Sequence, residues 1–307
     1  MLKFIVKRIF EAIPTMLVLI TISFFLMRFA PGNPFSSERP LPPEVMANIN
    51  AKYGLDKPVS EQYFTYLTNI LVKGDFGPSF KYKDYSVNEL ISSALPVSAK
   101  VGFFAFIFTV IVGVGVGTIA ALKQNTWMDY SIMSLAMIGV VLPSFVLAPV
   151  LIYIFSINIH WFPAGGWNDG SFKYMALPVL AMSLMYVATF ARITRGSMIE
   201  TMNSNFIRTA RAKGLSYGYI VLKHALRPAL LPVVSYMGPA FVGIITGSVV
   251  VETIFGLPGI GKLFVNAAFN RDYSLVMGVT ILIGFLFILF NAIVDILLAY
   301  IDPKIRY

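Results

Sequence analysis

The sequence contains no cysteine, only two histidines and few charged residues. Without cysteine the chain can form no disulfide and no Cys-ligated zinc or iron–sulfur site. Asp, Glu, Lys and Arg make up 13% of its 307 residues, against about 25% in an ordinary soluble chain. Hydrophobic residues reach 57%, and the mean hydropathy is +0.75. So few charges cannot cover the outside of a water-soluble globule of this size, which excludes a soluble cytosolic enzyme.

What the chain has instead is long apolar runs. A bilayer core of about 30 Å needs roughly 20 apolar residues in a helix, and six runs meet that requirement. The first is followed by PGNP and not by a small-residue cleavage site, so we interpret it as a retained helix and not a signal peptide. The sequence predicts an all-α polytopic membrane protein with six transmembrane helices, at residues 9–30, 101–122, 133–157, 174–191, 229–251 and 275–300.

Positive charge gathers on one side of these predicted spans. The loop between the fourth and fifth spans, residues 192–228, holds seven Lys or Arg residues against one acid, Glu200. Because cytoplasmic loops are enriched in Lys and Arg, this bias places the loop and both termini in the cytoplasm. The net charge of +9 therefore reflects membrane orientation, and no nucleic-acid partner is expected.

The segment between the first two spans, residues 31–100, is predicted to be a periplasmic insertion of short helices lying on the membrane surface. Helical patterns run over 42–53, ended by Gly54, and over 61–71. A turn-rich stretch, GDFGPSF, then precedes a further short helix over 86–95. The expected organisation is an N-terminal end with the first helix (1–30), the insertion (31–100) and a core of five transmembrane helices (101–307).

One short stretch resembles the motif of a nucleotide-binding phosphate loop. GLPGIGKL, residues 256–263, matches a phosphate-binding loop except that Leu263 stands where a Ser or Thr must bind magnesium. The run also follows a membrane helix, whereas a phosphate loop follows a strand. We expect an external re-entry into the last span and no ATP site. Asp295, near the end of that span, is interpreted as a helix-end acid or an interhelical bond. No cofactor, metal site or catalytic cluster is predicted.

Small residues gather in two spans. GVGVG, residues 113–117, lies in the second span, and Gly243 and Gly247 are spaced for close helix packing in the fifth. Packing is the favoured interpretation, but it is compatible with a helix face that lines a pathway. The candidate pathway residues are Gly243, Thr246 and Gly247.

The loop 192–228 has internal order beyond its charge. Phe206, Ile207 and Ala210 can share one face of a short helix, with Arg208, Arg211 and Lys213 on the polar side. Gly214 suits the residue that ends this helix, and Ser216 can cap a second. Two short amphipathic helices joined at a glycine could lie on the bilayer surface or dock in a groove of a soluble partner. The pattern alone does not separate these two possibilities.

This loop resembles the coupling signature of ABC-importer membrane subunits. Ala210, Gly214, Leu231 and Pro232 match that signature, while Arg208 and Thr209 replace its usual Glu-Ala, as in the dipeptide/oligopeptide branch. Further stretches resemble that branch in order along the whole chain: MRFAPGNPF, GDFGPSF, ARITRGSM, HALRPALLPV, ETIFGLPGIGKLF and IDPKIRY.

The resemblance implies a type I ABC-importer permease of a Gram-negative inner membrane that takes up oligopeptides and forms half of the pathway. Its partners would be a second homologous permease subunit, two cytoplasmic ATP-binding subunits and a periplasmic peptide-binding protein. An ion-coupled transporter would need membrane-depth acids or unwound helices, and a membrane enzyme would need clustered catalytic groups; neither is evident. The implied ATPase contacts are Phe206, Arg208, Thr209, Ala210, Arg211, Ala212, Lys213, Gly214 and Leu215.

Overall fold

The computed structural model describes residues 2–30, 35, 42–245 and 249–301. Within these residues the chain is nearly all helical, and five helices are long and apolar enough to cross a membrane, with a bent pair as the sixth crossing. The membrane helices are α1 (Leu2–Phe29), α4 (Val87–Leu122), the pair α5 (Trp127–Val141) and α6 (Ser144–Ile152) with η2 (Tyr153–Asn158), α7 (Phe172–Met202), α11 (Leu231–Ile245) with α12 (Val249–Ile254), and α14 (Tyr273–Ile301).

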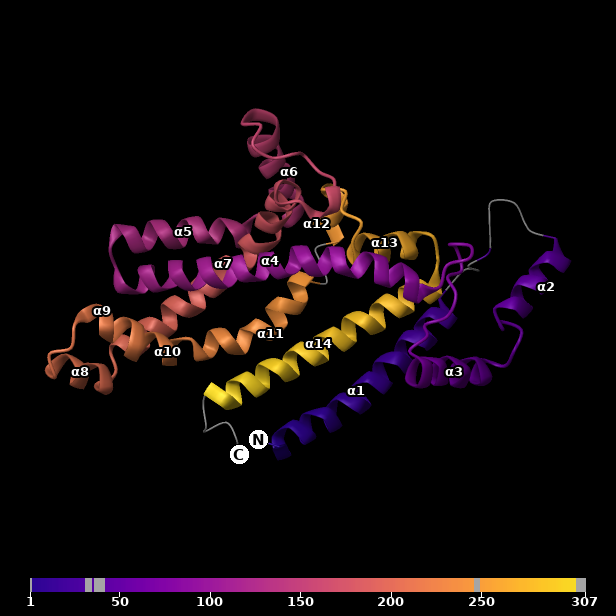
Figure 1. Cartoon of the computed structure of the whole chain (residues 1–307), viewed down its shortest axis with the longest axis horizontal. Helices are drawn as coiled ribbons and strands as arrows, with labels where there is room; N and C mark the ends of the chain where they lie inside the picture. The colour runs from indigo at the N-terminus through magenta and orange to yellow at the C-terminus, as the bar shows by residue number, and fades with distance from the viewer. Residues whose placement is uncertain (1, 31–34, 36–41, 246–248, 302–307) are drawn as a thin grey trace.

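The helices form two packed groups joined by α11. Helix α4 packs along α7, which also contacts α5, while α1 packs along α14 (Figure 1). Helix α11 contacts α4, α7 and α14 and so links the groups. Near one end of the second group, Arg8 Nη2 lies 3.0 Å from Asp295 Oδ2, which confirms that Asp295 makes an interhelical bond.

Helix α4 differs from the prediction. The short helix expected over 86–95 and the span expected from residue 101 are a single helix of 36 residues, about 54 Å long at 1.5 Å per residue. Ser86 begins it with a capping box: the Ser86 hydroxyl accepts from the Glu89 amide at 3.2 Å, and Glu89 accepts from the Ser86 amide at 2.8 Å. Pro96 lies inside the helix, where it removes one backbone hydrogen bond and its ring crowds the carbonyl of the preceding turn.

Glycines of α4 allow it to approach α7. A Cβ at Gly113 would lie 2.6 Å from the Phe190 Cβ, and one at Gly117 would lie 2.8 Å from the Thr194 Cβ, whereas a Cβ at Gly115 would meet nothing within 4 Å. Both distances are shorter than any side chain tolerates. The packing interpretation of the GVGVG run is therefore confirmed for two of its three glycines.

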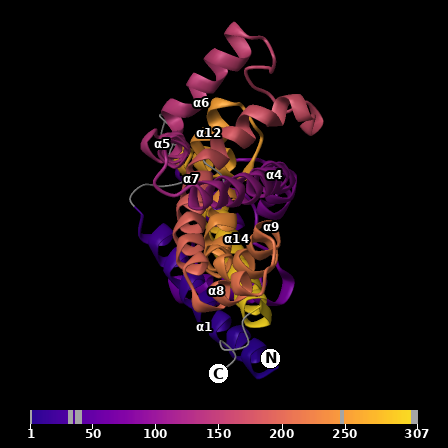
Figure 2. The same cartoon turned by 90° about the vertical axis from the view of Figure 1, so that its left-hand side faces the viewer.

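The third predicted span is broken. Helices α5 and α6 meet at Leu142–Pro143 with a bend of 108°, because Pro143 has no amide to continue the hydrogen bonding of α5. Figure 2 shows α6 projecting away from the body formed by α4 and α7. The predicted span over residues 133–157 is therefore present as a bent pair of helices, and the run is apolar throughout.

The insertion carries the expected short helices α2 (Pro43–Lys52) and α3 (Val59–Thr68), the latter extended by η1 (Asn69–Lys73). Gly54 follows α2 with φ of +65°, as its place at the helix end predicts. The stretch after η1 is fixed to the start of α14 through buried Asp272. This carboxylate accepts from the Ser79 hydroxyl, from the Phe80 amide at 3.1 Å and from the Leu275 amide at 3.2 Å.

Candidate functional site: the loop between the fourth and fifth spans

The loop that follows α7 folds as four short helical pieces at one end of the molecule (Figures 1 and 2). Their bounds are α8 (Asn205–Ala212), α9 (Tyr217–Tyr219), η4 (Ile220–Ala225) and α10 (Leu226–Ala229). The helix predicted before Gly214 is therefore present, and a second helical segment follows it.

A buried apolar cluster fixes this loop to the membrane helices. Ile207 of α8 is fully buried and packs with Met198 of α7, Ile220 of η4 and Ala121 of α4. Ala210, one turn further along α8, joins the same cluster and is 6% exposed. Any displacement of α8 therefore has to move the adjoining ends of α4 and α7 or break this packing.

The orientation of α8 corrects one expectation. Phe206 was expected to share a face with Ile207 and Ala210, but it is 50% exposed and points away from the cluster. Ala210 faces its own chain, so it is not the residue that meets a partner directly. The remaining predicted contact residues form one exposed area, which we call the coupling surface: Phe206, Arg208, Thr209, Arg211, Ala212, Lys213, Gly214 and Leu215.

Gly214 ends α8 in the way its position predicts. Its φ is +74°, a left-handed angle that favours glycine. The Leu215 amide donates to the Ala210 carbonyl at 3.4 Å, and the Gly214 amide donates to the Arg211 carbonyl at 2.9 Å. These two bonds are those of a Schellman motif. Ser216 occupies the N-cap position of α9, but its side chain makes no capping bond, so this part of the expectation is wrong.

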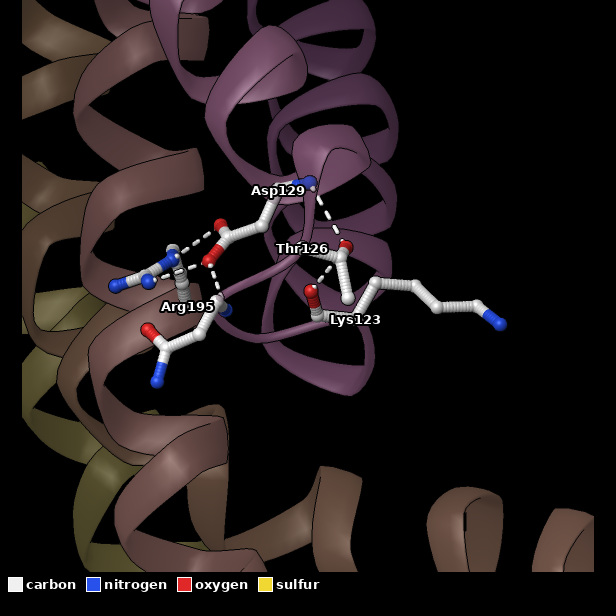
Figure 3. Close-up of polar contacts among 5 residues, drawn as sticks. Lys123, Thr126, Asp129 and Arg195 are labelled. Carbon is white, nitrogen blue, oxygen red and sulfur yellow. Dashed lines mark hydrogen bonds and ion pairs between the residues drawn. The ribbon is translucent and has the colours of Figure 1, made fainter.

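A buried ion pair lies beside the loop, and the sequence did not reveal it. Asp129, at the start of α5, is 1% exposed and accepts from both Nε and Nη2 of Arg195 at 2.7 Å (Figure 3). The Asn125 amide also donates to Asp129, at 3.0 Å. Bidentate pairs of this kind are strong and directional. The pair ties α5 to α7 near the loop 192–228, which we call the coupling loop. Its two residues are 66 positions apart, so no local pattern joins them.

At the opposite end of the bundle, the GLPGIGKL run surrounds a carboxylate of its own chain. Glu252 is 1% exposed; its Oε1 accepts from the Ser98 hydroxyl at 2.6 Å and its Oε2 from the Lys262 amide at 3.1 Å. A Cβ at Gly259 would lie 2.5 Å from Glu252 Oε2. The run follows helix α12 and opens α13 (Ile260–Phe269). The glycines therefore make room for a carboxyl group of the chain itself, where a phosphate loop would hold a nucleotide.

We expect Glu252→Ala to lower the melting temperature of the purified protein, because the donors around it lose their buried acceptor at a cost of about 1–3 kcal/mol each. Lys262→Ala is the matched control: Lys262 contributes its main-chain amide to the carboxylate, which alanine retains. It should change neither the melting temperature nor nucleotide binding. Loss of nucleotide binding by correctly assembled Lys262→Ala protein would contradict the assignment.

Only one of the three candidate pathway residues lies in the described part of the chain. Thr246 and Gly247 are outside it. Gly243 lies on α11 against the hydroxyl of Tyr186 from α7, so it makes room for a neighbouring side chain. The exposed stripe of α11 instead carries Pro232, Ser235 and Pro239.

Comparison with known proteins identifies the family of this chain. Residues 113–307 match the family "Binding-protein-dependent transport system inner membrane component", and residues 1–102 match the N-terminal membrane component of the same system. The oligopeptide transport system permease protein OppB of Escherichia coli strain K12 is 69% identical over 100% of both chains. The protein of that name in Haemophilus influenzae is 68% identical over 100% of both chains.

More distant similarities extend across the fold. A dipeptide transport system permease protein of Bacillus subtilis is 42% identical over 100% of this chain and 98% of its own. Among solved structures, the inward-facing MetNI methionine ABC transporter matches with a TM-score of 0.57 at 16% identity, covering 69% of this chain and 96% of that one. The helical bundle is therefore that of an ABC-importer permease. The chain belongs to the family of binding-protein-dependent transport system inner membrane components.

Proposed function

We propose that the chain is one of two membrane subunits of an ATP-driven importer that takes oligopeptides from the periplasm into the cytoplasm. The substrate class is supported by the full-length relatives named for oligopeptide transport. The proposed partners are a second homologous permease subunit, two cytoplasmic ATP-binding subunits and a periplasmic peptide-binding protein. In this assembly the chain supplies half of the pathway, and the ATP-binding subunits supply all hydrolysis.

The coupling surface is the observation on which this function depends. Two roles were possible for the loop, a lipid anchor or a docking surface. A lipid anchor needs a free apolar helix face, but Ile207 and Ala210, on the apolar face of α8, are buried against their own chain. What α8 leaves exposed is mostly basic and polar, with Phe206 as a protruding aromatic residue. That composition favours docking on a soluble partner, which we propose to be an ATP-binding subunit.

Movement at the coupling surface has a direct route into the membrane. The cluster below α8 includes residues of α4 and α7, and the Asp129–Arg195 pair extends the connection to α5. We propose that ATP-driven motion of the docked subunit reaches the pathway by this route. Gly243, Thr246 and Gly247 stay proposed pathway residues, next to the exposed stripe of α11.

The proposed orientation places the coupling loop and both termini in the cytoplasm and the insertion (31–100) in the periplasm, above a core of residues 101–307. The distribution of charge supports it. The insertion is held firmly by Asp272, so it can present a defined surface to a binding protein.

A single cysteine introduced into this cysteine-free chain tests the orientation. Asn48→Cys, on the exposed side of α2, should react with a membrane-impermeant thiol reagent in spheroplasts. Lys123→Cys, exposed between α4 and α5, should react only after the membrane is broken. The reverse labelling pattern would invert the proposed topology.

The function itself is tested by reconstitution. The chain, its homologous subunit and the ATP-binding subunits are placed in vesicles with the peptide-binding protein, and uptake of a labelled oligopeptide is followed. Uptake should require ATP and continue when the proton gradient is collapsed. Uptake that stops with the gradient while ATP is present would favour an ion-coupled transporter.

A further inference from the structure

The insertion forms one side of a pocket to which the proposed transport function gives no role. Its volume is about 300 Å³, and it lies where the last turns of α1, the first turn of α14, helix α3 and the 76–80 stretch meet. This volume is at the lower end of the range for pockets that hold small ligands, about 300–1,000 Å³. Apolar side chains of Phe24, Met27 and Met277 form part of its wall.

The pocket lies at the level of a membrane surface. Phe24, Met27 and Arg28 are in the last turns of the membrane-crossing part of α1, and Met277 is in the second turn of α14. Residues beside the lining are strongly apolar and exposed: Phe29, Phe64 and Val72 expose 74%, 64% and 76% of their surface. An aqueous surface rarely gathers such side chains. Helix α3 and the end of α1 therefore face lipid around the pocket.

Arg28 gives the pocket a positive charge. Its Nη2 donates to the Leu55 carbonyl at 3.3 Å, and within the part of the chain that the structure describes no carboxylate pairs with it. The other cation of the lining, Lys57, is already paired with Glu61 at 2.6 Å. The guanidinium therefore lies at an apolar rim with donors left for an anion, and guanidinium binds phosphate well.

Tyr66 supplies a second unsatisfied group. Its hydroxyl oxygen is buried and has no hydrogen-bond partner, although its ring lines the pocket. Burial raises the pKa of this hydroxyl, so it stays protonated and able to donate. An unsatisfied buried hydroxyl is a cost that a ligand oxygen would remove after a small adjustment of the wall.

We propose that this pocket binds the head group of an anionic phospholipid, with its phosphate at Arg28 and the start of an acyl chain against Phe24, Met27 and Met277. The apolar surroundings favour a lipid over a soluble anion, because the exposed side chains of Phe29, Phe64 and Val72 place the pocket beside the acyl chains of the bilayer. The proposed orientation makes this a lipid of the outer leaflet. The site itself requires only that α1 and α14 cross the membrane.

The test measures lipid retained by the protein. Purified chain is taken from vesicles of phosphatidylcholine with phosphatidylglycerol into mild detergent, and native mass spectrometry counts bound phosphatidylglycerol. Arg28→Gln should lower retention about tenfold, as expected when a hydrogen bond to a charged group is lost. Lys173→Gln removes the same charge from an exposed position at the start of α7 and should retain as much lipid as the unchanged protein.

A second pair of variants fills the pocket without removing charge. Thr65 is exposed and lines the pocket, whereas Thr68, exposed on the same helix, does not. Thr65→Trp should lose phosphatidylglycerol and Thr68→Trp should keep it. Equal retention by Arg28→Gln, Thr65→Trp and their controls would overturn the proposal. So would displacement of the lipid by inorganic phosphate or by an oligopeptide. Lipid retention is measured on the purified chain without any transport. The lipid result can therefore be interpreted even if the proposed import function proves wrong.

Discussion

Gly214→Val should lower peptide uptake several-fold while the chain still inserts into the membrane. A non-glycine residue at the left-handed angle of Gly214 costs about 1–2 kcal/mol, and an added Cβ would meet nothing within 4 Å. The effect is therefore one of backbone conformation. A shift of this size changes the population of the native elbow by a factor of about 5 to 30. Uptake by reconstituted vesicles measures it.

Gly218 provides the matched control for the elbow. It is exposed and open like Gly214, but its φ is not in the left-handed region. Gly218→Val should transport at close to the normal rate. If Gly214→Val keeps the ATP-binding subunits but hydrolyses ATP without uptake, the elbow transmits force; if the subunits are lost, it positions the docking surface. Normal uptake by Gly214→Val would refute a coupling role for this loop.

Breaking the Asp129–Arg195 pair should produce a large loss of stability. Removing one partner of a buried pair leaves the other charge uncompensated and costs about 3–5 kcal/mol. Asp129→Ala should fall at the lower end of that range, because the side chain of Arg195 is 27% exposed and can reach water. Arg195→Met should fall at the upper end, because Asp129 is 1% exposed. Thermal unfolding in detergent gives both values.

The double variant separates a charge effect from a packing effect. Asp129→Leu with Arg195→Met removes both charges and should recover most of the lost stability, since apolar replacements of buried pairs are often neutral. Glu200→Ala removes an exposed carboxylate from the same helix α7 and should change little. A double variant as unstable as Arg195→Met would show that the loss of stability comes chiefly from altered packing and not from an uncompensated charge.

The apolar runs of the sequence predicted the membrane helices well, because burial in lipid leaves the same signature wherever a span occurs. The boundary at residue 100 was not predictable in the same way. Ser98 and Lys100 interrupt the apolar pattern, so α4 was expected to begin after them. Their polar groups are satisfied by Glu252 and by the Gly170 carbonyl at 3.0 Å. Those partners are distant in sequence, and a local pattern cannot contain them.

In the coupling loop, too, features set by the local sequence were predictable, and features set by distant residues were not. The position of Gly214 predicted a left-handed helix end because the backbone requirement is local. Which face of α8 would be buried was decided by Ile220 and Met198 from other elements, so hydrophobicity alone placed Phe206 on the wrong side. Arg195 lay in a recognised stretch, but its role became visible only when α5 brought Asp129 beside it.

Helix α4 is in mechanical terms a lever. It is held about a third of the way along its length by the Ser98–Glu252 bond and at its C-terminal end by the packing of Ala121 in the cluster below α8. Between them, Gly113 and Gly117 keep it in backbone-level contact with α7, as a fulcrum would. With the pivot near Gly115, the Val87 end lies about 42 Å away and the Leu122 end about 10 Å away, so a rocking of about 10° moves these ends by about 7 Å and about 2 Å in opposite directions. We expect a push on the coupling surface to displace the far mouth of the bundle the opposite way and by the larger distance.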